Sequence, residues 1–399
     1  ALGYALGKKT PLLLSELQMQ KHTAIVGSTG SGKTVLLSLL QEHSLSSGRS
    51  LIFFDPKTCP QNITRFKALC ERYNRKYYVV SEFDKAPSLF NPLLEGSFQD
   101  VADRMMNALT WSEQYYKNEC ITALYKAMKQ VKEVQKEELS IAKIYEALEK
   151  HFDKKSISSL MSQLFAITCS DFGHLLEGNS NNSLTFDKIR EEGACVYIGF
   201  SALGQGSTGN AINKLFFGGL LHHCKSSYMH EDVETLKPMS IFFDELSSII
   251  HEGFIDLQNK CRGVNMEITY ATQCPSDIDR IDENLTTQIF ENTNNLFVFN
   301  QMIPKHTEFF SKTCGTTFTI KKTYATEDGY RSEMGTERET EEFIAHANIF
   351  RSLRVGQCVF LQRTPKRVEL INVRFEKVVK SAKIEGRVHV HGHRFNLLA

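Results

Sequence analysis

Short apolar runs recur along the chain and alternate with segments of helical composition. The run at 22–27 ends in glycine, and Thr34–Gln41 after it has the composition of a helix, which predicts a strand, a loop and a helix in succession. Further apolar, β-branched or aromatic runs lie at 51–55, 77–80, 195–200, 240–244, 267–272 and 295–299. Because helical stretches separate most of these runs, the pattern predicts an α/β fold with a mostly parallel, buried sheet.

The pattern changes between Gly96 and Gly178. Apolar residues there recur at helical spacing and no strand pattern is present. The segment therefore predicts an all-α domain inserted between two strands of the sheet, with Gly178–Ser183 as the return linker. The recurring apolar positions are Phe98, Val101, Ala102, Met105, Leu109, Ile121, Leu124, Tyr125, Met128, Ile141, Ile144, Tyr145 and Leu148.

The C-terminal part has two further patterns. The segment 323–340 is charged and nearly free of aliphatic residues, which predicts an exposed loop or a β-excursion. The apolar runs 357–362 and 368–375 are separated by a turn that contains proline, which predicts a hairpin.

Composition narrows the possible classes of protein. The chain has 399 residues, long for one core, and a formal net charge of +1, so any contact with DNA must be local. Its 10 Cys form no CxxC pair, which argues against a zinc site. No run approaches the roughly 18 apolar residues of a membrane span. The chain begins with Ala1 rather than Met, which leaves open that an N-terminal anchor precedes it.

One glycine-rich segment predicts a phosphate-binding loop. It matches the pattern G-x-x-x-x-G-K-[ST] and stands after a predicted strand and before a predicted helix. Its backbone N–H groups and the helix N-terminus would hold the phosphates of ATP. Lys33 would reach the β- and γ-phosphates, and the hydroxyl of Thr34 would hold Mg²⁺. The residues are Gly27, Ser28, Thr29, Gly30, Ser31, Gly32, Lys33 and Thr34.

Two acids end the apolar run at 240–244 and predict the hydrolytic half of the site. Asp244 would bind the Mg²⁺ ion with its water shell, and Glu245 would accept a proton from the attacking water. The alternative is structural, because Asp is also a common N-cap and Glu is common in the first turn of a helix.

Three further polar positions carry open alternatives. Gln273 ends the next apolar run and would contact the γ-phosphate or its water, unless it only caps the sheet edge. Arg262 would reach a neighbour's γ-phosphate as an arginine finger in a ring, unless it is a plain surface residue. Asp55–Lys57 either shapes the site or forms a turn opened by proline.

Taken in order, these segments resemble the coupling ATPases of conjugation and type IV secretion, the TraD/TraG group, which are relatives of FtsK- and HerA-type DNA pumps. The resemblance covers nearly the whole chain, including the helical insertion. It rests on the ordered segments His22–Thr34, Leu51–Lys57, Phe90–Leu93, Phe172–Leu176, Phe242–Leu246, Arg262, Ala271–Gln273 and Phe309–Gly315.

The resemblance implies a RecA-like P-loop ATPase with an all-α domain. On this basis 1–95 and 184–378 would be the two parts of a nucleotide-binding domain and 96–183 the inserted domain. The tail 379–399 would be disordered or added by cloning, and we assign it no function. The catalytic residues would be Lys33, Asp244, Glu245, Gln273 and Arg262, with ATP and Mg²⁺ as ligands.

The resemblance also implies where such a protein works. Family members assemble as homo-hexamers at the cytoplasmic face of the bacterial inner membrane and deliver DNA or protein, such as a relaxosome or effectors, to a type IV secretion channel. This chain itself is expected to be soluble. Two alternatives stay open: a docking platform that uses nucleotide to hold an assembly state, and a HerA/FtsK-type DNA pump unrelated to secretion.

Overall fold

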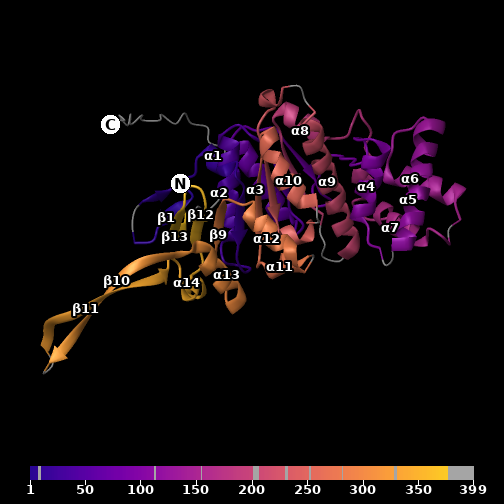
Figure 1. Ribbon diagram of the computed structural model, residues 1–399. Coiled ribbons are helices and arrows are strands. Elements are labelled where there is room, and N and C mark those ends of the chain that lie inside the picture. The colour runs from indigo at the N-terminus through magenta and orange to yellow at the C-terminus, as the bar shows by residue number, and fades with distance from the viewer. Residues whose placement is uncertain are drawn as a thin grey trace, which may run out of the picture.

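The computed structural model describes residues 1–7, 10–111, 114–153, 155–200, 206–229, 232–250, 253–280, 282–327 and 330–375. At its centre is an 11-stranded sheet of order β2-β1-β13-β12-β9-β3-β8-β7-β4-β6-β5 (Figure 1). The strands from β9 to β5 in that order are parallel, which confirms the predicted mostly parallel α/β fold. They are β3 (Thr23–Val26), β4 (Ser50–Phe54), β5 (Tyr77–Val80), β6 (Cys195–Ile198), β7 (Met239–Asp244), β8 (Met266–Thr272) and β9 (Asn295–Val298).

An antiparallel extension continues the sheet beyond β9. The predicted C-terminal hairpin is confirmed as β12 (Gln357–Gln362) and β13 (Arg367–Val373), and β12 also pairs with β9. Two N-terminal strands were not predicted: β1 (Gly3–Ala5) pairs with β13, and β2 (Pro11–Leu12) pairs with β1. Strands this short carry too few residues to show a strand pattern, and only pairing with a distant segment defines them.

Helices cover both faces of the parallel sheet, and successive strand residues enter two different cores. Ile25 and Phe242 pack under α2 (Lys33–Ser46) and α3 (Pro60–Arg72), whereas their neighbours on the strands enter the core of the opposite face. Burial on both faces explains why these strands appear in the sequence as continuous apolar runs. The opposite face is covered by α9 (Gly206–Ser227), α10 (Gly253–Cys261) and α12 (Glu283–Glu291).

The remaining helices of the sheet domain lie in the connections. They include the 3-10 turns η3 (Val233–Thr235), η4 (Leu246–Ser248) and η5 (Arg262–Val264). The α-helices among them are α1 (Glu16–Met19), α11 (Ser276–Asp279), α13 (Pro304–Cys314) and α14 (Ala347–Ser352).

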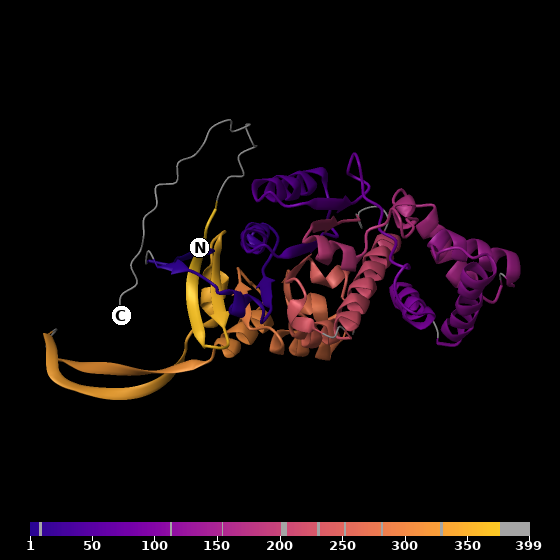
Figure 2. The same ribbon diagram turned by 90° about the horizontal axis from the view of Figure 1, so that it is seen from above.

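Between β5 and β6 the described residues form helices and no strand. Figures 1 and 2 show α4 to α7 gathered beside the sheet domain. The helical character predicted for this stretch is therefore confirmed, whereas the domain boundaries 96 and 183 stay a prediction. The elements are α4 (Phe98–Ala108), α5 (Gln114–Lys129), the π-helical turn η1 (Gln130–Val134), α6 (Ile141–His151), α7 (Ser158–Thr168), the 3-10 turn η2 (Gly173–Leu176) and α8 (Phe186–Glu192).

Asn91 joins the two ends of the helical insertion. Its buried side-chain amide donates to the carbonyl oxygens of Leu139 and Gly178, each at 2.8 Å. Its backbone N–H donates to Ser183 Oγ at 2.8 Å. A buried amide with all these partners stabilises the segments that it connects. Asn91 therefore ties the chain that enters the insertion to the chain that leaves it.

A long hairpin projects from the sheet domain on the side away from α4–α7 (Figures 1 and 2). It pairs β10 (Thr316–Glu327) with β11 (Tyr330–Phe343). Of the two alternatives for 323–340, an exposed loop or a β-excursion, the structure therefore shows the second, and it extends beyond this segment at both ends. Cross-strand pairs Lys321–Glu342 and Lys322–Glu337 support it.

Two further expectations concern a membrane-spanning segment and the C-terminal tail. In the part of the chain that the structure describes, no helix is both long and apolar enough to cross a bilayer. The predicted tail 379–399 lies outside the described residues.

Candidate functional site

The strand order brings the predicted site residues to one edge of the sheet. β3, β8 and β7 are neighbours in that order, with Val26 beside Thr272 and Ala271 beside Asp244. Because these strands are parallel, their carboxyl ends meet at the same edge, where open α/β sheets bind ligands. The glycine-rich loop after β3, Gln273 after β8, and Glu245 after β7 therefore converge.

The loop after β3 has the backbone of an anion cradle. Gly30 and Gly32 adopt φ values of 79° and 115°, which other residues rarely reach. α2 begins directly after the loop at Lys33, so its free N–H groups face the loop. The buried Oγ of Ser31 has no hydrogen-bond partner among the described residues. The loop thus offers unpaired donors and a helix N-terminus, which fits the phosphates of a nucleotide.

Lys33 folds back over this loop. Its ammonium donates to the carbonyl oxygens of Gly27 and of Ser28, the latter at 3.1 Å. Burial lowers the pKa of Lys33, and the carboxylates of Glu245 and Asp244 oppose that shift. The ammonium therefore lies between the phosphate loop and the two acids, where it can meet a phosphate.

Asp244 and Thr34 line one small cavity of about 20 Å³. Burial raises the pKa of Asp244 to about 6; the Asp55 carboxylate adds to the rise, and the charges of Lys57 and Lys33 oppose it. A carboxylate and a hydroxyl are oxygen donors of the kind that Mg²⁺ prefers. The donor set therefore fits the predicted metal, and the assignment of Thr34 and Asp244 to Mg²⁺ stays a prediction.

Glu245 is held by three side-chain donors. Its Oε2 accepts from Lys57 Nζ at 2.7 Å and from Gln273 Nε2 at 3.1 Å, and its Oε1 accepts from Ser247 Oγ at 2.9 Å. Burial acts to raise the pKa of Glu245, but these hydrogen bonds outweigh it and hold the pKa below its usual value. The residue also has a φ of 80°, a conformation that residues other than glycine adopt only at a cost in energy.

Gln273 lies between the loop and Glu245, as the order β3-β8-β7 requires. Its side-chain amide nitrogen donates to Glu245, and its backbone carbonyl oxygen accepts from Gln301 Nε2 at 3.0 Å. Gln273 therefore contacts the proposed base, and its contact with the γ-phosphate or its water stays a prediction.

Arg262 is not brought to this edge. It lies in η5 (Arg262–Val264), just before β8 begins, and therefore at the opposite edge of the sheet from Gln273. It is exposed, and its charge acts there on His22 at the start of β3. Within one chain Arg262 does not meet the site, so its role as a finger toward a neighbouring subunit stays a prediction.

Lys57 is a residue of the candidate nucleotide site that the sequence does not predict. The sequence leaves two alternatives for 55–57, a turn opened by proline or a segment that shapes the site. The structure contains elements of both. Asp55 accepts from the backbone N–H of Lys57 at 3.0 Å, which forms the turn, while the Lys57 ammonium reaches Glu245. The available signal was a cation three residues after the end of β4, a predicted strand of the sheet.

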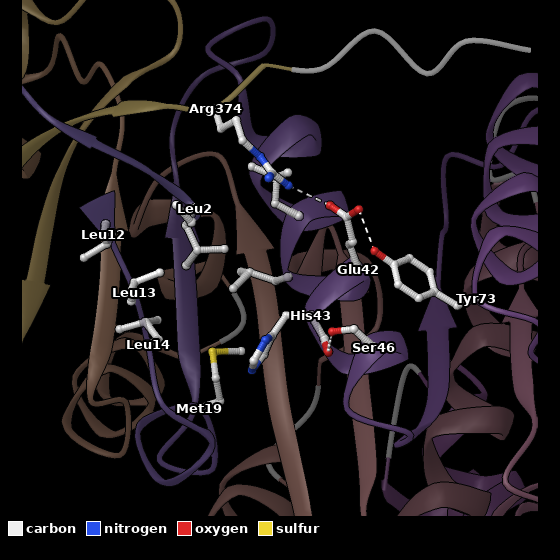
Figure 3. Close-up of a pocket in the computed structure, with 13 residues that line it drawn as sticks. Leu2, Leu12, Leu13, Leu14, Met19, Glu42, His43, Ser46, Tyr73 and Arg374 are labelled. Carbon is white, nitrogen blue, oxygen red and sulfur yellow. Dashed lines mark hydrogen bonds and ion pairs between the residues drawn. The ribbon is translucent and has the colours of Figure 1, made fainter. Parts of the chain in front are cut away.

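A separate hollow lies between the N-terminal residues 1–14 and α2 (Figure 3). Its volume is about 240 Å³. Glu42 lines it and accepts from Arg374 at 2.8 Å and from the Tyr73 hydroxyl at 2.7 Å. None of the residues predicted for the nucleotide site lines this hollow, so we assign it no part in the chemistry.

Two family models match the chain. The one described as the central domain of the helicase HerA matches residues 1–209, about half of the chain. The one described as the TraM recognition site of TraD and TraG matches residues 238–352. No curated protein matches the chain.

Solved structures share the fold at low sequence identity. The bacterial conjugative coupling protein TrwB, in a form with sulphate, has a TM-score of 0.70 and 14% identity over 94% of this chain and 89% of that chain. TrwB with ADP and Mg²⁺ has a TM-score of 0.65 and 15% identity over 94% and 89%. VirB4 of Thermoanaerobacter pseudethanolicus has a TM-score of 0.63 and 13% identity over 94% and 96%. The chain therefore belongs to the HerA central-domain family and is a P-loop protein of the TraD/TraG coupling-ATPase type.

Proposed function

We propose that this chain is the motor of a coupling ATPase, which hydrolyses ATP to deliver DNA or protein to a type IV secretion or conjugation channel. The observation that carries the proposal is the convergence of the phosphate loop, Gln273 and Glu245 at one sheet edge. A protein that only bound nucleotide would need the loop alone, whereas a buried carboxylate beside that loop is a candidate general base for hydrolysis.

The residues would divide the chemistry as follows. The N–H groups of Gly27–Thr34 and the Lys33 ammonium would bind the phosphates, and Glu245 would accept a proton from the attacking water. Gln273 would orient Glu245 and that water. Thr34 and Asp244 would hold Mg²⁺, which when bound neutralises phosphate charge.

In this proposal 1–95 and 184–378 form the motor and 96–183 an appended helical domain. The motor works as a homo-hexamer at the cytoplasmic face of the inner membrane, and its partners are channel proteins together with a relaxosome or effector substrates. Two findings support this cellular role: the match of residues 238–352 to a region of TraD and TraG, and a fold shared with TrwB over most of both chains.

Steady-state ATP hydrolysis, measured over a range of protein concentrations with and without single-stranded and duplex DNA, tests the motor. We expect ATP turnover to rise as the protein assembles, and we expect Glu245→Gln to reduce it strongly. Nucleotide binding without turnover under every condition would instead favour the docking platform.

A HerA-type DNA pump is the second candidate, and the match of residues 1–209 to the HerA central domain favours it. Such a pump would translocate duplex DNA with no secretion protein present. A triplex-displacement assay with the isolated protein separates the two: displacement without partners supports the pump, and displacement only with channel or relaxosome proteins supports the coupling role.

A further inference from the structure

We propose that Lys57 is a ligand of the γ-phosphate, and that the arrival of ATP transfers its ammonium from Glu245 to that phosphate. In the nucleotide-free protein Lys57 neutralises the general base, and in the ATP-bound protein it stabilises the phosphate and leaves the base free. The inference rests on the proposed function, because it assigns a further residue to the same site.

The two partners differ in how far they are free to move. The Glu245 side chain is 7% exposed, whereas that of Lys57 is 52% exposed, although their charged atoms lie 2.7 Å apart. The carboxylate is fixed by Ser247 and Gln273 as well, so it does not need Lys57 in order to keep its position. The lysine is therefore the partner that can leave.

Hydrogen bonds tie the backbone before Lys57 to the end of β4, so the proposed movement is one of the Lys57 side chain alone. Asp55 is fully buried and accepts from the Tyr197 hydroxyl at 2.6 Å, from Asn62 Nδ2 at 2.8 Å and from the Lys57 N–H at 3.0 Å. These bonds hold the start of the loop at the end of β4, next to β7 in the sheet. Four flexible methylene groups then extend the ammonium over the site.

When ATP binds, its γ-phosphate would give the Lys57 ammonium a second anionic partner at this edge of the sheet. Lys33 contacts the phosphate loop, while Lys57 contacts the base that must face the γ-phosphate and its water. A phosphate placed between them offers Lys57 a second anion.

A resting pair of this kind has a consequence for catalysis. Glu245 Oε2 already accepts two hydrogen bonds, so it is poorly placed to accept a proton from water while Lys57 remains. ADP has no γ-phosphate and leaves the pair intact. Only ATP would displace the ammonium, and hydrolysis would let it return to Glu245.

The test is a binding titration with ADP and with a non-hydrolysable ATP analogue, which requires no turnover. Lys57→Met should weaken binding of the analogue about 10- to 100-fold, the usual weight of a charge-assisted hydrogen bond, and leave ADP affinity unchanged. Lys57→Arg keeps the charge and should recover part of the loss. The matched control is Lys67→Met, which removes another lysine–carboxylate pair, to Asp84 at 2.6 Å, outside the site.

Each outcome of the titration either supports or overturns the proposed role of Lys57. A selective loss for the ATP analogue, with a lower kcat in Lys57→Met, supports the inference, and normal ADP binding shows that the variant is folded. An equal loss for ADP and the analogue, no loss for either, or faster hydrolysis by Lys57→Met would overturn it. If the wild-type protein binds neither nucleotide, the proposed function fails first and this inference falls with it.

Discussion

Gln273 Nε2 donates to Glu245 Oε2 over 3.1 Å, and the two residues follow neighbouring parallel strands, β8 and β7. The proposed general base, Glu245, is therefore held by a residue that follows β8, the strand between β7 and the strand before the phosphate loop. This arrangement links the base to the place where the γ-phosphate would lie.

Replacing Gln273 with Ala should lower kcat for ATP hydrolysis about 5- to 10-fold, because one hydrogen bond from an amide to the carboxylate of the base is lost. The KM for ATP should change little, since the phosphate loop is untouched. Steady-state kinetics measures both constants. Gln163→Ala, which removes a half-buried amide that bonds to Thr110 in the helical insertion, is the control. An unchanged kcat would return Gln273 to a purely structural role.

Glu245→Gln should bind ATP and hydrolyse it roughly 10²–10⁴ times more slowly, because an amide cannot accept the proton of the attacking water. Single-turnover hydrolysis and nucleotide titration together separate chemistry from binding. Glu291→Gln provides a matched control, since it alters an ion pair of the same 2.7 Å separation, with Arg363, away from the site. Wild-type turnover by Glu245→Gln would mean that the residue only terminates β7.

Lys33→Ala should abolish turnover and weaken nucleotide binding, because the ammonium next to the phosphate loop is lost. Isothermal titration with the ATP analogue and a turnover assay test the two effects. Lys305→Ala, in the first turn of α13, should change neither. Normal steady-state hydrolysis by Lys33→Ala would contradict the assignment of the phosphate loop.

His22 makes the stability of the motor domain dependent on pH. Its Nε2 lies 3.0 Å from the carbonyl oxygen of Gln258, and its Nδ1 accepts from the Ile268 N–H at 3.2 Å, which requires the neutral ring. Burial lowers the pKa of His22 to about 4. Because the unfolded chain takes up the proton near pH 6.5, the unfolded state binds more protons between pH 6.5 and 4, and stability falls as the pH falls.

Between pH 7 and 5 this effect should cost about 2 kcal/mol of unfolding free energy. His22→Gln, which can donate and accept but does not titrate, should be less stable at pH 7 and show a flatter decline toward pH 5. Chemical denaturation at several pH values measures both curves. Parallel curves for the two proteins would show that His22 does not cause the decline.

The chemistry that could be predicted from the sequence lies in local patterns. Gly27–Thr34 and the acids after 240–243 are contiguous motifs, and buried parallel strands make continuous apolar runs. The contact between Lys57 and Glu245 joins residues separated by 188 positions and depends on β4 lying beside β7. Strand order, which no local pattern states, decides such contacts. The same reason explains why the role of Asn91 emerged only with the fold.

Arg262 lies at the amino edge of the sheet, before β8, so a single chain leaves the nucleotide site without it. In a ring, that edge of one subunit would need to face the carboxyl edge of the next for Arg262 to reach a γ-phosphate. A transition state with charge on the equatorial oxygens gains most from a guanidinium supplied on assembly, and such a finger is worth about 10³–10⁵ in rate. An isolated chain should then be nearly idle.

Mixing two inactive proteins tests this arrangement. Lys33→Ala subunits keep Arg262, and Arg262→Ala subunits keep an intact phosphate loop, so some interfaces of a mixed ring would contain both. Activity should partly return under conditions that form rings, and neither variant alone should show it. The control mixes Lys33→Ala with Lys33→Ala/Arg262→Ala, which offers no intact loop and should stay inactive. If mixed rings confirmed by mass show no recovery, Arg262 acts within its own subunit or only at the surface, and the assignments of Lys33, Asp244 and Glu245 stand unchanged.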